Sequence, residues 1–323
     1  MASERTLFII IVSALALGGC ASTTLTAGAN LAKVGQATAT QMEQNATISS
    51  NAMLSLRKAV AFNDGFNAQI GNQDSETFLT HVASVQSKIS QYAKMLDSLA
   101  STYSALGDLA AYDAAGSFNT SVKALDKDAN AFFQSVQSNI QIPQEAASAV
   151  EVGGGIVIGL IQADRIKNSS KIIRAKLQMI IPIVDNPKTK NLLILNKELT
   201  TEQLNQAAET MFDCGVYSYG PLLDDLGVPL NLKSNSQSDA VVANNEKLKR
   251  GLRNVADELG NQQIDQMAAS YDKSVTALKA LVPLHESLEK GAPLNLDTVL
   301  AITSQLQTIA TSLQPTTQPV KGK

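Results

Sequence analysis

Residues 75–112 read SETFLTHVASVQSKISQYAKMLDSLASTYSALGDLAAY, and this stretch decides the fold. Its large apolar side chains recur at alternating spacings of four and three residues, at Phe78, Val82, Val85, Ile89, Tyr92, Leu96, Leu99, Tyr103 and Leu106. Such a heptad pattern places one narrow apolar stripe along a long helix. Asp74 or Ser75 is a natural cap for its first turn. The stretch therefore predicts a long helix that packs against other helices.

A second stripe follows a break in this register. The break contains Gly116, and the four-three spacing resumes out of phase at Phe118, Val122, Leu125, Ala129, Phe132 and Val136. We predict a turn or kink at Gly116 and then a second helix to about residue 141. Ile142-Pro143 ends that helix or starts the next one, because proline suits a first helical turn.

Weaker patterns extend the helical prediction in both directions. Residues 31–62 keep the spacing with smaller side chains and precede a glycine-containing loop at 63–74. Thr200 and Gln203 form a capping box for a helix that stops at Gly215, and residues 215–238 read as irregular. Two further stripes lie near the C-terminus: Leu248, Leu252, Val255 and Leu259, and then Met267, Tyr271, Ser274, Leu278, Leu281, His285 and Leu288.

These patterns predict an all-α protein, an elongated antiparallel helical bundle with long heptad-patterned helices. A turn at Gly291–Pro293 precedes a final helix over 295–313. The expected parts are a signal peptide (1–19), a tether (20–30), a long-helix coiled-coil part (31–143), a central segment (144–198), a C-terminal helical part (199–313) and a disordered tail (314–323).

Composition limits the possible functions. The 323 residues carry a formal net charge of −3, which argues against a general nucleic-acid binder. Two cysteines exclude a disulfide scaffold and a multi-cysteine metal site, and two histidines leave little for histidine-based catalysis.

The N-terminus resembles a bacterial lipoprotein precursor. Arg5 precedes an apolar stretch of 12 residues, Thr6–Leu17, and Leu17-Gly18-Gly19-Cys20 resembles the lipobox of that family. The resemblance implies cleavage before Cys20, a diacylglycerol on its thiol and a third acyl chain, such as palmitate, on the new N-terminus. Ala21 stands where an Asp commonly retains such proteins in the inner membrane, so the resemblance implies the outer membrane of a Gram-negative bacterium, on the periplasmic face. The alternative is an ordinary secretory signal with an accidental cysteine.

The central segment combines a glycine-rich apolar run with positive charge. Residues 152–161 contain no charge, and Gly155, Gly159 and Ala163 recur every fourth residue. From 165 to 197 there are eight Lys or Arg residues against one acid, Asp185. We therefore select as possible membrane or partner contacts Gly155, Ile156, Ile158, Gly159, Arg165, Lys167, Lys171 and Arg174.

Two interpretations of this segment remain open. It loosely resembles, in architecture only, the α-helical pore-forming toxins, which conceal an apolar insertion element at mid-chain. That similarity implies a membrane-active protein using residues 144–184. The plainer interpretation places 152–161 inside the bundle, with the cations solvated or facing an acidic partner.

The sequence contains no recognisable catalytic or cofactor motif. The glycine run does not fit a nucleotide-binding fingerprint, and His285-Glu286 lacks the second histidine of a zinc helix. Asp126, Asp128 and Asn130 begin like a calcium loop, but Ala131 and Gln137 replace the glycine and glutamate that such a loop requires.

The remaining reactive side chains have structural interpretations. We expect His81 and His285 to be packing or interface residues, and Asp224-Asp225 to cap a turn. Cys214 is expected to be a buried small side chain, with an intermolecular disulfide as its alternative.

The functional expectation is a non-catalytic lipoprotein that acts as a helical scaffold or protein-interaction module. It would be bound to the membrane through the lipid on Cys20, and its helical stripes would serve a protein partner or self-association. We expect no nucleic acid, metal or cofactor other than that covalent lipid. An enzyme with an unrecognised site around Asp225 is the third possibility.

Overall fold

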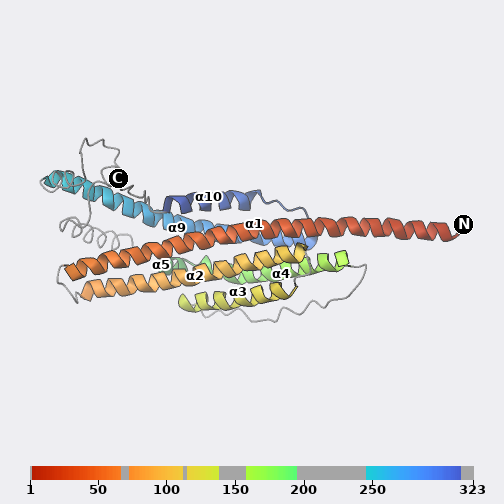
Figure 1. Cartoon of the computed structure of the whole chain (residues 1–323), viewed down its shortest axis with the longest axis horizontal. Helices are drawn as coiled ribbons and strands as arrows, with labels where there is room; N and C mark the ends of the chain where they lie inside the picture. The colour runs from red at the N-terminus through yellow and green to blue at the C-terminus, as the bar shows by residue number, and fades with distance from the viewer. Residues whose placement is uncertain (1, 67–72, 112–114, 138–157, 195–244, 314–323) are drawn as a thin grey trace, which may run out of the picture. The chain divides into compact units, whose positions relative to one another are not determined.

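A computed structural model describes residues 2–66, 73–111, 115–137, 158–194 and 245–313 (Figure 1). Its helices are α1 (Ala2–Phe66), α2 (Gln73–Ala111), α3 (Ala115–Ser135), α4 (Ile158–Val184), α5 (Pro187–Leu193), α9 (Glu246–Lys290) and α10 (Asp297–Leu313). They pack against one another, and the described residues contain no strand, which confirms the predicted all-α helical bundle. The predicted helix at 199–214 and the tail at 314–323 lie outside these residues.

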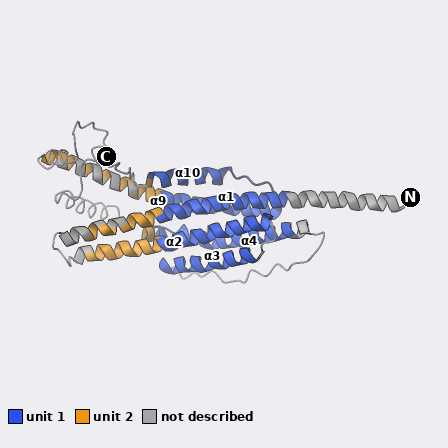
Figure 2. Ribbon diagram, in the orientation of Figure 1, with its two compact units in different colours: residues 1–47, 90–190, 270–312 blue, residues 48–89, 191–269, 313–323 orange. Residues whose placement is uncertain are grey.

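The chain forms two compact units, coloured separately in Figure 2. Unit 1 comprises residues 1–47, 90–190 and 270–312, and unit 2 comprises 48–89, 191–269 and 313–323. Helices α1, α2 and α9 contribute residues to both units. The predicted parts follow the order of the sequence, whereas each compact unit combines early and late segments because long helices pair side by side.

Within unit 1, neighbouring contacts establish antiparallel pairing. Gly35 of α1 lies against Tyr103 of α2, and Ala32 lies near Gly107, so the two helices run in opposite directions. The ring centroids of Tyr92 in α2 and Phe132 in α3 are 5.3 Å apart. Within unit 2, Arg57 Nη1 of α1 donates a hydrogen bond of 3.1 Å to Gln86 Oε1 of α2.

The main predicted stripe is confirmed, but the predicted width is wrong. All nine stripe positions between Phe78 and Leu106 are buried. The side chains of Met95, Thr102 and Leu109, which lie outside the stripe, are buried too. The reason is that α2 in unit 1 contacts several helices, so a single narrow stripe cannot cover all of them.

Two of the later stripes, from Phe118 to Val136 and from Met267 to Leu288, are confirmed with changed boundaries. Every position of the stripe from Phe118 to Val136 is buried, but α3 ends at Ser135, not near residue 141. The backbone turns there because Gln137 adopts a left-handed conformation, with φ of 59°. The stripe from Met267 to Leu288 is also buried, on the single 45-residue helix α9.

The expected tether is wrong for residues 23–30, which continue helix α1. Thr24 is buried, and a Cβ atom built on Gly28 would lie only 2.7 Å from the Ile166 side chain of α4. The small residues of this stretch permit a close helix-helix approach, which a larger side chain would prevent. Their spacing (Gly28, Ala32, Gly35) also continues the pattern of the downstream helix.

A glycine cap ends α9 and directs the chain back along the bundle. Gly291 has a φ of 68°, and its N–H donates to the carbonyl of Leu288 at 3.1 Å. The N–H of Ala292 donates to the carbonyl of Ser287 at 2.8 Å. These two bonds form a Schellman motif, which confirms the predicted turn. Helix α10 follows at Asp297, close to the predicted start.

Candidate functional site around helix α4

The structure describes only part of the predicted apolar contact. Gly155 and Ile156 lie outside the described residues, and Ile158 and Gly159 form the first turn of α4. Cys20 lies within α1. Among the described residues, none of the helices combines the length and the apolar character that a membrane span needs.

The four predicted cations do not form one solvent-exposed face. Arg165 is buried, Lys167 is half-buried and Lys171 is exposed. Arg174 is engaged with α9: its Nε and Nη2 atoms donate hydrogen bonds of 2.8 Å to the two carboxylate oxygens of Glu289. Glu286 lies 3.7 Å from Arg174 Nη1.

This pairing changes the electrostatics of Arg174. The hydrogen bonds that Arg174 donates to Glu289 raise the pKa of its guanidinium, and the negative charges of Glu289 and Glu286 add to that effect. Bidentate Arg–carboxylate geometry is both directional and strong. Arg174 therefore joins α4 to α9 within unit 1, and its charge is compensated inside the protein.

A second ion pair on α4 was not predictable from the sequence pattern. Lys176 Nζ lies 3.0 Å and 3.1 Å from the two carboxylate oxygens of Asp126 in α3. Both residues are buried; Asp126 follows the stripe residue Leu125 in the sequence, and Lys176 precedes the buried Leu177. Asp126 lies within helix α3 and faces the ammonium group of Lys176.

The buried histidine joins three helices. His285 Nε2 of α9 lies 2.8 Å from the Tyr103 hydroxyl of α2, and its Nδ1 lies 2.8 Å from Ser170 Oγ of α4. All three residues are fully buried. Burial, and secondarily the positive charge of Arg174, lowers the pKa of His285 to about 3, so the ring is neutral at ordinary pH.

A serine hydroxyl next to an imidazole is also the arrangement of a nucleophile and its base. Here no side-chain surface of Ser170 or His285 reaches solvent, so a substrate has no access to either atom. The predicted packing role of His285 is therefore confirmed, and the cluster is a polar layer of the core. His81, by contrast, is exposed.

Other predicted reactive residues remain untested. Cys214 and Asp224-Asp225 lie outside the described residues. Among the described residues, no group of three or more His, Cys, Asp or Glu side chains is arranged to hold a metal ion.

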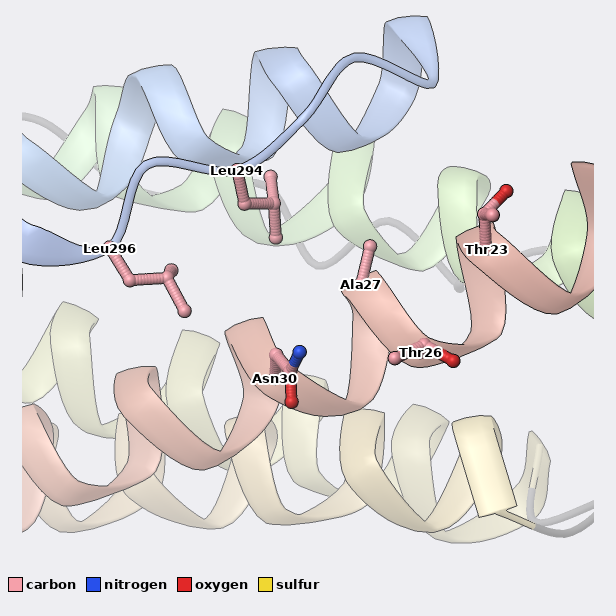
Figure 3. A pocket seen from close by; sticks show the side chains of 6 residues that line it. All are labelled: Thr23, Thr26, Ala27, Asn30, Leu294 and Leu296. Carbon is pink, nitrogen blue, oxygen red and sulfur yellow. The ribbon is translucent and has the colours of Figure 1, made fainter.

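A pocket of about 330 Å³ lies between α1 and the segment that joins α9 to α10 (Figure 3). Its lining comprises Thr23, Thr26, Ala27, Asn30, Leu294 and Leu296. Figure 3 shows the two leucines projecting from the connecting segment toward the turn of α1 that carries Ala27. The sequence does not indicate this pocket, because the small polar residues 20–30 read as a tether.

Comparison with protein-family models, curated proteins and solved structures gave no match for this chain.

Proposed function

We propose that this chain is a non-catalytic lipoprotein that acts as a helical scaffold or protein-interaction module. A lipid on Cys20 anchors it to the outer membrane of a Gram-negative bacterium, on the periplasmic face. The proposed anchoring is supported by the sequence Leu17-Gly18-Gly19-Cys20, which follows a 12-residue apolar stretch. Several acyl chains on one residue give stable attachment, whereas a single chain gives marginal binding.

The contacts of the bundle support the scaffold role. The buried polar groups of unit 1 join helices to one another, as Lys176 with Asp126 and His285 with Tyr103 do. Helices held in this way present fixed surfaces to a partner, and a preorganised surface binds at lower entropic cost.

The toxin-like alternative has less support. It needs the cations of α4 to meet an anionic membrane surface, but Arg165 is buried and Arg174 is paired with Glu289. An insertion element with these residues would have to break the α4–α9 contact first.

Metabolic labelling with an alkyne analogue of palmitate tests the anchoring. The chain has two cysteines, so Cys214→Ser is a matched control for Cys20→Ser. We expect label on the unmodified chain and on Cys214→Ser, together with fractionation to the outer membrane. Label that persists on Cys20→Ser would contradict the proposal.

Capture of the tagged, lipidated protein from cross-linked cell envelopes tests the scaffold role. We expect a second protein, or further copies of this chain, at comparable abundance by mass spectrometry. Dye leakage from anionic liposomes caused by the unlipidated chain, and abolished by Ile158→Asp, would instead favour the membrane-active alternative.

A further inference from the structure

The pocket on α1 lies beside the position of the proposed lipid. Cys20, Thr23, Ala27 and Asn30 are spaced by three, four and three residues on one continuous helix. Positions with this spacing share one face of an α-helix. The pocket residues of α1 therefore lie at positions on the same helix face as position 20.

The size of the pocket suits part of a lipid. Its volume of about 330 Å³ is at the lower end of the range for small-molecule sites, about 300–1,000 Å³. From Cys20 to Asn30 the helix rises about 15 Å. One leaflet of a bilayer, which is half of the ~30 Å hydrocarbon core, has the same thickness, so an extended acyl chain spans this distance.

The apolar part of the pocket lining comes from the segment that joins α9 to α10. Leu294 and Leu296 are half-buried and line the pocket opposite α1, while Thr23 and Thr26 carry methyl groups as well as hydroxyls. The Schellman cap at Gly291 holds the connecting segment in this position. Two adjacent leucine side chains left partly exposed are apolar surface that a hydrocarbon would cover.

We propose that this pocket binds one of the acyl chains attached to Cys20. The inference rests on the proposed lipidation of that residue. The acyl chain is attached to Cys20, about one helical turn from Thr23, so its effective concentration at the pocket is high. A few apolar contacts therefore suffice to retain it there. The remaining acyl chains stay in the membrane, so the docked chain fixes the N-terminal part of α1 against the bilayer surface.

Photo-crosslinking in intact cells tests this proposal. Cells that express the full chain are grown with a diazirine analogue of palmitate, irradiated, and the protein is digested with trypsin. Residues 20–33 and 291–321 are two separate tryptic peptides, and the second contains both leucines. We expect the lipid on Cys20 to join these two peptides.

Three variants make the test specific. Leu294→Gln with Leu296→Gln is expected to lower the joined pair about tenfold, because amides replace the apolar lining. Ala27→Met fills the pocket from α1 and should lower it without altering the connecting segment. Leu300→Gln is the matched control, because Leu300 is 50% exposed on α10, lies outside the pocket and belongs to the same tryptic peptide. Circular dichroism checks that each variant retains its helices.

The outcomes separate the inference from the proposed function. The intact mass of the Cys20 peptide reports lipidation independently of crosslinking. A lipidated peptide that never joins residues 291–321, or joins them equally in all variants, would overturn the pocket proposal and leave the anchoring intact. A Cys20 peptide without lipid would overturn both.

Discussion

Helix α4 carries two cations, two residues apart, that meet their acids in different surroundings. The Lys176 side chain is 9% exposed and its partner Asp126 is 1% exposed. The Arg174 side chain is 23% exposed, and its partners Glu289 and Glu286 are 19% and 41% exposed. A buried pair has lost the hydration of both charges, whereas a pair near the surface keeps part of it. Neighbouring cations in one basic run can therefore form ion pairs of very different burial.

The largest expected effect comes from separating the buried pair. Asp126→Ala leaves the Lys176 ammonium without its carboxylate, which should lower the free energy of unfolding by about 3–5 kcal/mol. Urea denaturation followed by circular dichroism measures the change. The double variant Asp126→Leu with Lys176→Met removes both charges and should recover most of the loss. Equal destabilisation of the single and double variants would show that the ion pair is not the cause.

The histidine bonded to Ser170 of α4 gives the next effect, as a dependence on pH. The folded state keeps His285 neutral, with a pKa of about 3, whereas the unfolded chain has the ordinary value near 6.5. Between these values the unfolded state binds more protons. Stability is therefore complete above pH 6.5 and falls by up to about 1.4 kcal/mol per unit as the pH drops toward 3.

Denaturation in urea at pH 7 and pH 4.5 measures this loss, expected at about 2–3 kcal/mol. The control is His285→Gln, whose amide can bond to Tyr103 and Ser170 but does not titrate. A loss of the same size in His285→Gln would assign the pH dependence to other groups.

Breaking the partly exposed pair of Arg174 and Glu289 should lower the free energy of unfolding much less. Arg174→Gln is expected to lower the free energy of unfolding by about 1 kcal/mol or less. The difference from the unmodified chain should shrink in high salt, because salt screens charges near the surface. The same variant removes a positive charge that lowers the pKa of His285, so the acid-induced loss should become smaller. A cost as large as that of Asp126→Ala would remove the contrast between the two pairs.

The smallest effect is expected at Lys171, an exposed lysine within the basic run. Lys171→Gln should change the free energy of unfolding by less than about 0.5 kcal/mol, as surface substitutions usually do. The same urea titration measures it. A loss above that limit would show that the basic run acts as one coupled network.

Much of the fold was predictable because the spacing of apolar residues in the sequence indicates which face of each helix is buried. The stripe from Phe78 to Leu106 identified the buried face of α2, and the stripe from Met267 to Leu288 identified that of α9. Composition was misleading where small residues were involved. Residues 23–30 look like a flexible spacer, yet Gly28 allows α1 to approach Ile166 closely.

Side-chain pairing between distant helices was not predictable from spacing alone. Lys176 and Asp126 are 50 residues apart, and His285 is 115 residues from Ser170. Which helix faces which is settled by packing in three dimensions, so a charge or hydroxyl next to a stripe gives no partner. The pocket was missed for a related reason, since it combines the start of the bundle with the segment after Gly291.

The continuity of α1 past Cys20 limits how far the protein can reach. A flexible linker of ten residues would have a root-mean-square end-to-end distance of about 17 Å, so the attached domain could occupy many positions. A helix instead fixes Thr24 about 6 Å from Cys20 along its axis. Under the proposed lipidation, a short and rigid helical connection therefore holds unit 1 close to the membrane. Its partners would have to lie at the bilayer surface or come to it, and the rotation of α1 about its own axis would decide which face they meet.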